Sequence, residues 1–491
     1  MAARTLLIAA AFATAAIAAP LEVEERQACA SVWSQCGGNN WNGATCCVTG
    51  NTCSVINEWY HQCIPGAAAT TTVRTTSSAR PTSSSSVRPT SSSSVRPTTS
   101  SAVTRTSSAT STRATGSTST TRAPVGSGTA TWSGNPYSGV NLWANNYYRS
   151  EVLNLAVPSL TGAMATAAAR VAEVPSFMWL DTFSKTPLMR ETLADIRAAN
   201  AAGGNYAGQF VVYDLPDRDC AAAASNGEYS LDNNGIANYR NYINTIRDII
   251  VEYSDIRMLL VIEPDSLANM VTNMNVPKCA NAADAYHECT LYAVTQLNLP
   301  NVAMYLDAGH AGWLGWPANQ AGAAETFASV YIEAGRPRAL RGLVTNVSNY
   351  NAWLLSSPPS YTTPNPVYDE SKYVHALAPL LEARGWTGVR FITDQGRSGR
   401  QPTGQLEWGH WCNARGTGFG RRPTANTGDE LLDAFVWVKP GGEADGTSDT
   451  TADRYDHFCG SASSVIPAPE AGTWFQAYFV QLLENANPSF M

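Results

Sequence analysis

The 491-residue sequence lacks the motifs of several large enzyme classes. It contains no GxSxG nucleophile elbow, no HExxH zinc pair, no P-loop and no GxGxxG at the start of a βαβ unit. Its six histidines are scattered along the chain. The usual signatures of serine hydrolases, zinc peptidases, nucleotide-binding enzymes and dinucleotide-binding enzymes are therefore missing.

Positive charge and long apolar runs are also scarce. The 32 Lys and Arg residues are outnumbered by 39 Asp and Glu residues, which gives a net charge of −7. Without a dense basic face, a nucleic-acid partner is not expected. Apart from the N-terminal residues, no stretch is apolar enough to span a membrane.

The N-terminus has the pattern of a secretory signal. Arg4 precedes an apolar run that is too short to cross a bilayer, and an A-x-A cleavage site ends at Ala18. We predict a signal peptide over 1–18, a pro-segment over 19–26, and secretion to the extracellular space. Eleven cysteines fit an oxidising compartment. A glycosylation sequon at Asn346 adds weak support, because such sequons also arise by chance.

Composition divides the remaining chain into three parts. Residues 27–65 hold six of the eleven cysteines and are too few for a self-sufficient core, so disulfides of undetermined pairing must replace it. Residues 66–128 have almost no large apolar side chains and repeat SSSSVRPT at 83–90 and 91–98. They predict a disordered linker, either an O-glycosylated stalk or a plain spacer. Residues 129–491 have the composition of a globular domain.

In this domain, apolar strand-like runs alternate with stretches of helical spacing. The pattern predicts a buried parallel sheet, either an open doubly wound sheet or a β/α barrel. Several runs end in a carboxylate, which favours the barrel, whose active site lies at the C-terminal strand ends. Any single carboxylate could instead cap the next helix. The runs are 177–180, 209–215, 258–262, 302–306, 340–347, 389–393 and 432–438, and the carboxylates are Asp181, Asp214, Glu263, Asp265, Asp307 and Asp394.

Paired carboxylates are what glycoside hydrolysis requires. The segments at 213–220 (YDLPDRDC) and 261–266 (VIEPDS) resemble the two signature regions of the family 6 glycoside hydrolases. The segments at 305–316 and 438–443 continue the match, which extends over nearly all of 130–491 and is closest to secreted fungal cellobiohydrolases. Residues 29–63 resemble a family 1 cellulose-binding module, through QCGG at 35–38 and YHQC at 60–63.

The resemblance implies an α/β fold, a distorted (β/α) barrel of about seven parallel strands. Long loops, roughly 216–233 and 439–470, would roof a tunnel. The implied activity is that of an exo-acting cellulase, which hydrolyses β-1,4-glucosidic bonds of cellulose with inversion and releases cellobiose from non-reducing ends. No cofactor, metal or membrane is expected, and the enzyme should be a monomer. An endo-β-1,4-glucanase on the same fold and a non-catalytic cellulose-binding protein remain alternatives.

The resemblance also implies roles for individual residues. Asp265 would be the general acid, Asp219 a second carboxylate that keeps Asp265 protonated, and Asp445 a base that acts through a water chain. Tyr213 would distort the sugar ring, and Ser225 would hold the attacking water. For Asp219 and Asp445, a solvated loop residue and a flexible turn remain simpler interpretations, and His310 could be structural. The implied sugar-binding or supporting residues are Trp179, Asp181, Asp307, His310, Trp313, Trp316, Trp411, Lys439 and Glu443.

The same resemblance implies a pairing for the cysteines of the large domain. Cys220 would bond Cys279 and Cys412 would bond Cys459, which leaves Cys289 free in a helix. Each bridge would brace one loop, the first carrying Asp219 and the second Asp445.

In the small module, aromatic side chains are expected on the surface. Trp33, Trp59 and Tyr60 would form a flat strip along a cellulose chain, with help from Asn57 and Gln62. A module of this size has little interior in which to bury three large aromatic side chains.

This strip gives a first prediction. Replacing Trp33 by Ala removes one stacking surface, so the full-length variant should lose most of its partitioning onto crystalline cellulose. A sedimentation binding assay measures the bound fraction, and unchanged partitioning would refute the predicted strip.

Overall fold

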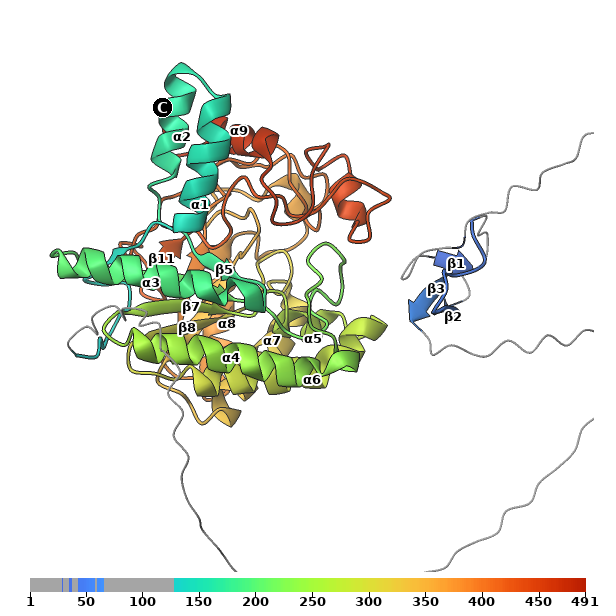
Figure 1. Cartoon of the computed structure of the whole chain (residues 1–491), viewed down its shortest axis with the longest axis horizontal. Coiled ribbons are helices and arrows are strands. Elements are labelled where there is room, and N and C mark those ends of the chain that lie inside the picture. Colours follow the sequence, from blue (N-terminus) through green and yellow to red (C-terminus); the bar gives the residue numbers. More distant parts are fainter. Residues whose placement is uncertain (1–28, 30–34, 38–42, 58–59, 66–127) are drawn as a thin grey trace, which may run out of the picture. The chain divides into compact units, whose positions relative to one another are not determined.

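The computed structural model describes residues 29, 35–37, 43–57, 60–65 and 128–491 (Figure 1). They belong to two units, a small N-terminal module and a large domain, which are considered separately. The predicted signal peptide, the predicted pro-segment and all of the predicted linker over 66–128 except its last residue lie outside the described residues. Within the described part, no helix combines the length and the apolar character needed to cross a membrane.

The module is a small antiparallel sheet held by disulfides. Its strands run in the order β1-β3-β2. Cys29 bonds Cys46, and Cys36, which is buried, bonds Cys53. These bridges take the place of a hydrophobic core, as the cysteine content predicted. The strands are β1 (Gln35–Gly37), β2 (Asn51–Asn57) and β3 (Tyr60–Pro65).

The predicted cellulose-binding strip is described only in part. Trp33 and Trp59 lie outside the described residues. The backbone of Asn57 pairs with that of Tyr60 between β2 and β3, and Gln62 pairs with Ser54 on the same two strands. The strip therefore stays a prediction.

Seven parallel strands form the curled sheet of the large domain, in the order β11-β10-β9-β8-β7-β6-β5, and the short β4 pairs with the start of β6. Side chains of these strands are buried on both faces, which explains the continuous apolar runs in the sequence. All seven predicted runs are confirmed as strands. These seven are β5 (Met178–Leu180), β6 (Tyr206–Val212), β7 (Met258–Ile262), β8 (Val302–Asp307), β9 (Leu340–Thr345), β10 (Arg390–Asp394) and β11 (Leu432–Val436). The two-residue strand β4 (Asn141–Leu142) was not predicted.

The barrel is distorted because its first and last long strands do not form a ladder. In the described domain the two edges meet through the Phe177 N–H, which donates to the Trp437 carbonyl at 3.0 Å. The Trp179 indole donates to the Val438 carbonyl at 2.9 Å. Side chains such as Val261 and Tyr305 fill the interior. Closure therefore depends on isolated contacts rather than on paired strands.

Helices surround the sheet, and most connect consecutive strands (Figure 1). Helices α3, α4, α6, α7 and α8 contact one another in that order around the outside. Helices α2 and α9 pack together in a second apolar cluster. The helices are α1 (Asn146–Glu151), α2 (Gly162–Val171), α3 (Thr186–Ala201), α4 (Gly235–Glu252), α5 (Leu267–Thr272), α6 (Pro277–Gln296), α7 (Pro317–Glu333), α8 (Glu370–Ala383) and α9 (Gln476–Glu484).

The sequon at Asn346 is not a surface feature. Asn346 follows β9 with 0% of its surface exposed, and its side-chain amide donates to the Asn351 and Asp394 carbonyls at 2.9 and 2.7 Å. A glycan on this nitrogen would replace one of its two hydrogens, so at least one of these hydrogen bonds would be lost, and the buried position leaves no space for a sugar. The sequon therefore gives no support for glycosylation of the folded domain.

The buried amide gives a second prediction. Replacing Asn346 by Ala leaves two buried carbonyls without this donor, so the free energy of unfolding should fall by about 2 kcal/mol or more. Chemical denaturation measures this change. Peptide mapping of the secreted wild-type protein should find Asn346 unmodified, and a glycopeptide there would contradict the buried position.

Candidate active site

A cavity of about 560 Å³ lies at the C-terminal ends of the parallel strands. This is the location expected for a β/α barrel. All five predicted catalytic residues line it, although they come from three separate parts of the chain. The predicted residues that line the cavity are Tyr213, Asp219, Ser225, Asp265, Asp445, Trp179, Asp181, His310, Trp313, Trp411, Lys439 and Glu443.

Two long loops enclose the cavity and touch each other. Ala224 of the first loop is buried against the disulfide between Cys412 and Cys459. A methyl group built on Gly446 of the second loop would lie only 2.8 Å from the Ala224 side chain. This contact supports the predicted roof over the cavity.

The disulfides of the large domain agree with the resemblance. Cys220 bonds Cys279, Cys412 bonds Cys459, and Cys289 is free and buried in α6. The first bridge directly follows Asp219, so it fixes the loop next to a cavity carboxylate.

Asp265 follows β7 and adopts a left-handed backbone conformation, with φ of 57°. Its N–H donates to Asp307 Oδ2 at 3.0 Å, and the Gly309 N–H donates to the same oxygen at 3.3 Å. Burial raises the pKa of Asp265 well above its usual range, and the carboxylates of Asp307, Asp219 and Asp445 raise this pKa further. Asp265 is therefore suited to hold a proton and deliver it.

Asp219 lies on the first loop, also with a left-handed backbone (φ of 58°). Its Oδ2 accepts a hydrogen bond from the Ser225 N–H at 2.7 Å, and Arg218 Nε donates to the Ser225 carbonyl at 2.9 Å. Burial raises the pKa of Asp219, while the Ser225 N–H and the Lys278 ammonium oppose that rise. The two predicted residues Asp219 and Ser225 are thus joined directly, and Asp219 is not a freely solvated loop residue.

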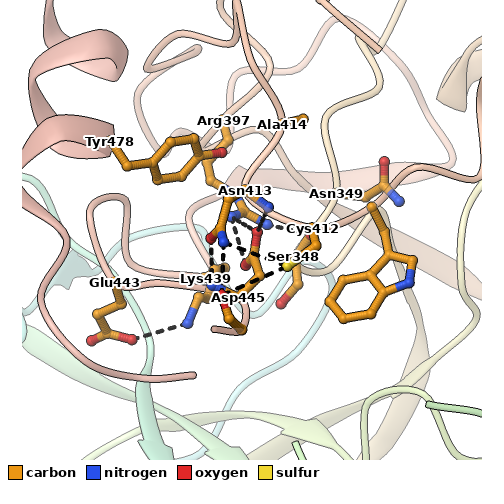
Figure 2. Close-up of polar contacts among 12 residues, drawn as sticks. Ser348, Asn349, Arg397, Cys412, Asn413, Ala414, Lys439, Glu443, Asp445 and Tyr478 are labelled. Carbon is orange, nitrogen blue, oxygen red and sulfur yellow. Dashed lines mark hydrogen bonds and ion pairs between the residues drawn. The ribbon is translucent and has the colours of Figure 1, made fainter. Parts of the chain in front are cut away.

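Asp445 is held by donors on several sides (Figure 2). Arg397 Nη1 lies 2.8 Å from both carboxylate oxygens. The Tyr350 hydroxyl and the Asn413 N–H each donate to Oδ2 at 2.8 Å. The residue is 7% exposed, so the flexible-turn interpretation is wrong. These four contacts hold the carboxylate in one orientation at the cavity wall.

Charged groups gather beside Trp179 in the cavity wall. Lys439 Nζ lies 3.1 Å from Glu443 Oε2 (Figure 2). The same nitrogen lies 5.9 Å from the centre of the Trp179 ring. Glu151, at the end of α1, lies next to Glu443. Burial is the main cause that raises the pKa of Glu151 to about 8, and the nearby Glu443 carboxylate adds to this rise. The pair can therefore share one proton near neutral pH.

Aromatic side chains and one neutral imidazole form other parts of the wall. The Trp313 indole donates to Thr272 Oγ1 at 2.7 Å, which fixes the ring. Burial lowers the pKa of His310 to about 4, so the imidazole is neutral near pH 7. The Gly312 N–H donates to His310 Nδ1 at 3.1 Å. His310 faces the cavity as an uncharged polar group and does not act as a cation.

Some predicted residues do not reach the cavity. Trp316 donates to the Gly312 carbonyl at 2.9 Å and packs beside Trp408. Asp307 is 2% exposed, and its carboxylate accepts the hydrogen bond from the Asp265 N–H that fixes the turn. Neither is among the lining residues, so the structure places both in supporting positions.

The other strand-end carboxylates brace loops. Asp394 is the clearest example, since it accepts hydrogen bonds from the Gly396 and Lys439 N–H groups at 2.9 and 3.0 Å. Asp214 is buried against Arg218 at 3.2 Å. Asp214, Glu263, Asp307 and Asp394 do not line the cavity, so for these four strand-end carboxylates the structural interpretation applies.

Trp408 and Arg397 belong to the site but were not predicted from the sequence. Trp408 lines the cavity and donates to Asn351 Oδ1 at 2.8 Å. Its position in the segment WGHW at 408–411, beside Trp411, was an available signal. No sequence signal pointed to Arg397, because it lies 48 positions before its partner Asp445.

One group of side chains in the small module has the spacing of metal ligands. Among the described residues, the group of three side chains close enough to share an ion is Cys36, Cys47 and Cys53. All three are disulfide-bonded, so they offer no thiolate.

Comparisons with known proteins agree with this geometry. The family model "Glycosyl hydrolases family 6" matches residues 137–486, and "Fungal cellulose binding domain" matches residues 32–60. "Exoglucanase 2" of Hypocrea jecorina is 70% identical over 477 residues, or 97% of this chain and 98% of that protein. "Putative endoglucanase type B" of Fusarium oxysporum is 65% identical over 486 residues, or 99% of each protein. The catalytic core of the cellobiohydrolase Cel6A from Chaetomium thermophilum is 68% identical with a TM-score of 0.72, and the match covers 73% of this chain and 100% of that one.

The shared proton gives a third prediction. Because the folded state raises the pKa of Glu151, it binds this proton more tightly than the unfolded chain between about pH 4.5 and pH 8. Stability should therefore fall as pH rises through this window, and replacing Glu151 by Gln should make the fall smaller. Melting temperatures at pH 5 and pH 8 measure it. Glu443, Lys439 and Lys185 face the same group and remain in place in both proteins. An equal fall in both would contradict the shared proton.

Proposed function

The chain belongs to glycosyl hydrolase family 6 and is a cellulase, and from this premise we propose how its cavity works. The proposed enzyme is a cellobiohydrolase that hydrolyses β-1,4-glucosidic bonds with inversion and releases cellobiose from non-reducing chain ends. The observation that carries the proposal is the joint position of Asp219 and Asp265 in one roofed cavity with tryptophan walls.

Asp265 is proposed as the general acid. Its carboxyl group is held protonated by burial and by three neighbouring carboxylates. When a glycosidic oxygen approaches, the proton passes to that oxygen and the leaving sugar departs. The hydrogen bond from the Asp265 N–H to Asp307 fixes the turn, so the acid keeps one direction.

Asp219 is proposed as the charged partner in this step. Its negative charge disfavours ionisation of Asp265 before the proton is needed, and it stabilises positive charge that develops on the sugar ring. Ser225, whose N–H binds Asp219, is proposed to hold the attacking water beside this carboxylate. Tyr213, which packs edge-on against Trp179 at 5.3 Å, is proposed to press on the ring and distort it.

The hydrogen bonds of Asp445 limit how it could accept the final proton. As a base, Asp445 must lose part of its contact with Arg397 or Tyr350, or take the proton through a chain of water molecules. The second route agrees with inversion, in which acid and base are spaced to admit water. We propose this route, with Asp445 as the acceptor at its end.

The exo mode is proposed from the roof. Because the two loops meet at Ala224, a chain enters most readily by its end and is held between cuts. The rival mode is internal cutting of the chain. The relative from Fusarium oxysporum that is named "Putative endoglucanase type B" is the reason to test for it. Carboxymethylcellulose separates the two, since rapid loss of viscosity relative to sugar released indicates internal cuts.

The rest of the chain is proposed to deliver this domain to its substrate. The matched module would bind cellulose, and the linker would let the catalytic domain reach nearby chain ends. Secretion through a cleaved signal peptide and action as a monomer complete the proposal.

The proposed acid gives a fourth prediction. Replacing Asp265 by Asn keeps the shape but removes the proton donor, so kcat on amorphous cellulose should fall about 100-fold or more. Replacing Asp307 by Asn should cost less, because that residue acts only through the Asp265 turn. Soluble sugar release measures both rates, and undiminished hydrolysis by the Asp265 variant rules out its role.

The product of the wild-type enzyme should be mainly α-cellobiose. A β product would overturn the proposed inversion.

A further inference from the structure

Lys278, the second residue of α6, lies behind the loop that carries Asp219. Its ammonium group donates to the Arg218 carbonyl at 3.0 Å, the Asp219 carbonyl at 3.3 Å and Asn226 Oδ1 at 2.5 Å. A lysine ammonium has three donors, so each is used within this loop. The acceptors lie on both sides of Ser225 and Asp219.

We propose that Lys278 is a positioning residue for the reaction, because its ammonium group fixes the loop at 217–226 so that Asp219 and Ser225 face one point of the cavity. The inference rests on the proposed roles of these two residues. Lys278 itself is not among the residues that line the cavity, so it acts through the loop and does not contact the sugar.

The loop needs such fixation because its backbone is strained. Asp217 and Asp219 both have left-handed conformations, with φ of 54° and 58°. For residues other than glycine, such a conformation is unfavourable and persists only when its surroundings hold it. The Tyr286 hydroxyl donates to the Asp217 carbonyl at 2.8 Å, and Lys278 holds the next two carbonyls. Together they orient three successive peptide groups.

The neighbouring disulfide does not make Lys278 redundant. The bond between Cys220 and Cys279 holds their Cα atoms 4.8 Å apart. It restrains the distance at one point, but not the rotation of the peptide groups that precede it. Lys278 supplies that second restraint from the adjacent position in α6.

The ammonium also places positive charge beside Asp219. Lys278 and Arg218 favour the charged carboxylate, while Asp456 of the roof disfavours it. Tyr213 and Asp265 also face Asp219, from the ends of β6 and β7. Arg218 already binds the Ser225 carbonyl and Asp214, so it does not replace the lost charge if Lys278 is removed.

The test compares full-length variants on cellotetraose. Replacing Lys278 by Met keeps the stem but removes charge and donors, and we expect kcat to fall about 10-fold or more with KM nearly unchanged, because small misplacements of catalytic groups are costly. Without the ammonium, the pKa of Asp219 rises further, so the acidic limb of the kcat/KM profile should move to higher pH. Lys372→Met, a matched change on the surface of α8, should leave both quantities unchanged.

A second variant keeps the test decisive if the Met variant does not fold. Lys278→Arg retains the charge, but a planar guanidinium does not match the three acceptors, so kcat should fall while the acidic limb stays in place. Wild-type kcat in either Lys278 variant, or an unmoved limb in a folded Met variant, would overturn the inference. Asp265→Asn is assayed beside them. If it stays active, the proposed function fails; if it alone is inactive, only the role of Lys278 fails.

Discussion

Exclusion of water from a few carboxyl groups is the constraint on which the rest of the structure depends. A carboxyl group that is buried beside others keeps its proton, and Asp265 is in this situation because Asp307, Asp219 and Asp445 surround it. The barrel provides the converging strand ends, and the two loops provide the cover. Without the cover, water would solvate the carboxylates, and their mutual effect on pKa would weaken.

The negative groups are tolerated because each has its own partners. Asp445 has Arg397, Tyr350 and Asn413, and Asp219 has the Ser225 N–H. The difference between the carboxyl groups therefore comes from their surroundings. One is arranged to hold a proton and another to hold a charge, which is the division of roles that glycoside hydrolysis uses.

The sequence was a good guide to the fold and a partial guide to the site. Continuous apolar runs predicted every strand from β5 to β11, because parallel strands that are buried on both faces leave a clear pattern. For a strand-end carboxylate such as Asp394, the sequence left two roles open, because an aspartate that braces a loop and one that faces a cavity occupy the same kind of position. The role of Arg397 could not be predicted from the sequence, because only the folded chain brings it into contact with Asp445. The burial of Asn346 could not be predicted either, because a glycosylation sequon is a sequence pattern that carries no information on exposure.

The disulfides have a consequence for how the enzyme comes to be active. Each of the two in the large domain ties a cavity loop to a distant segment, and one directly follows Asp219. A newly made chain in a reducing compartment would have the same amino acids and the same strands, yet neither of these loops would be covalently tied. Oxidation after synthesis is thus a step in assembling the acid–base geometry, and the biosynthetic route taken by the chain shapes its catalytic competence as well as its destination.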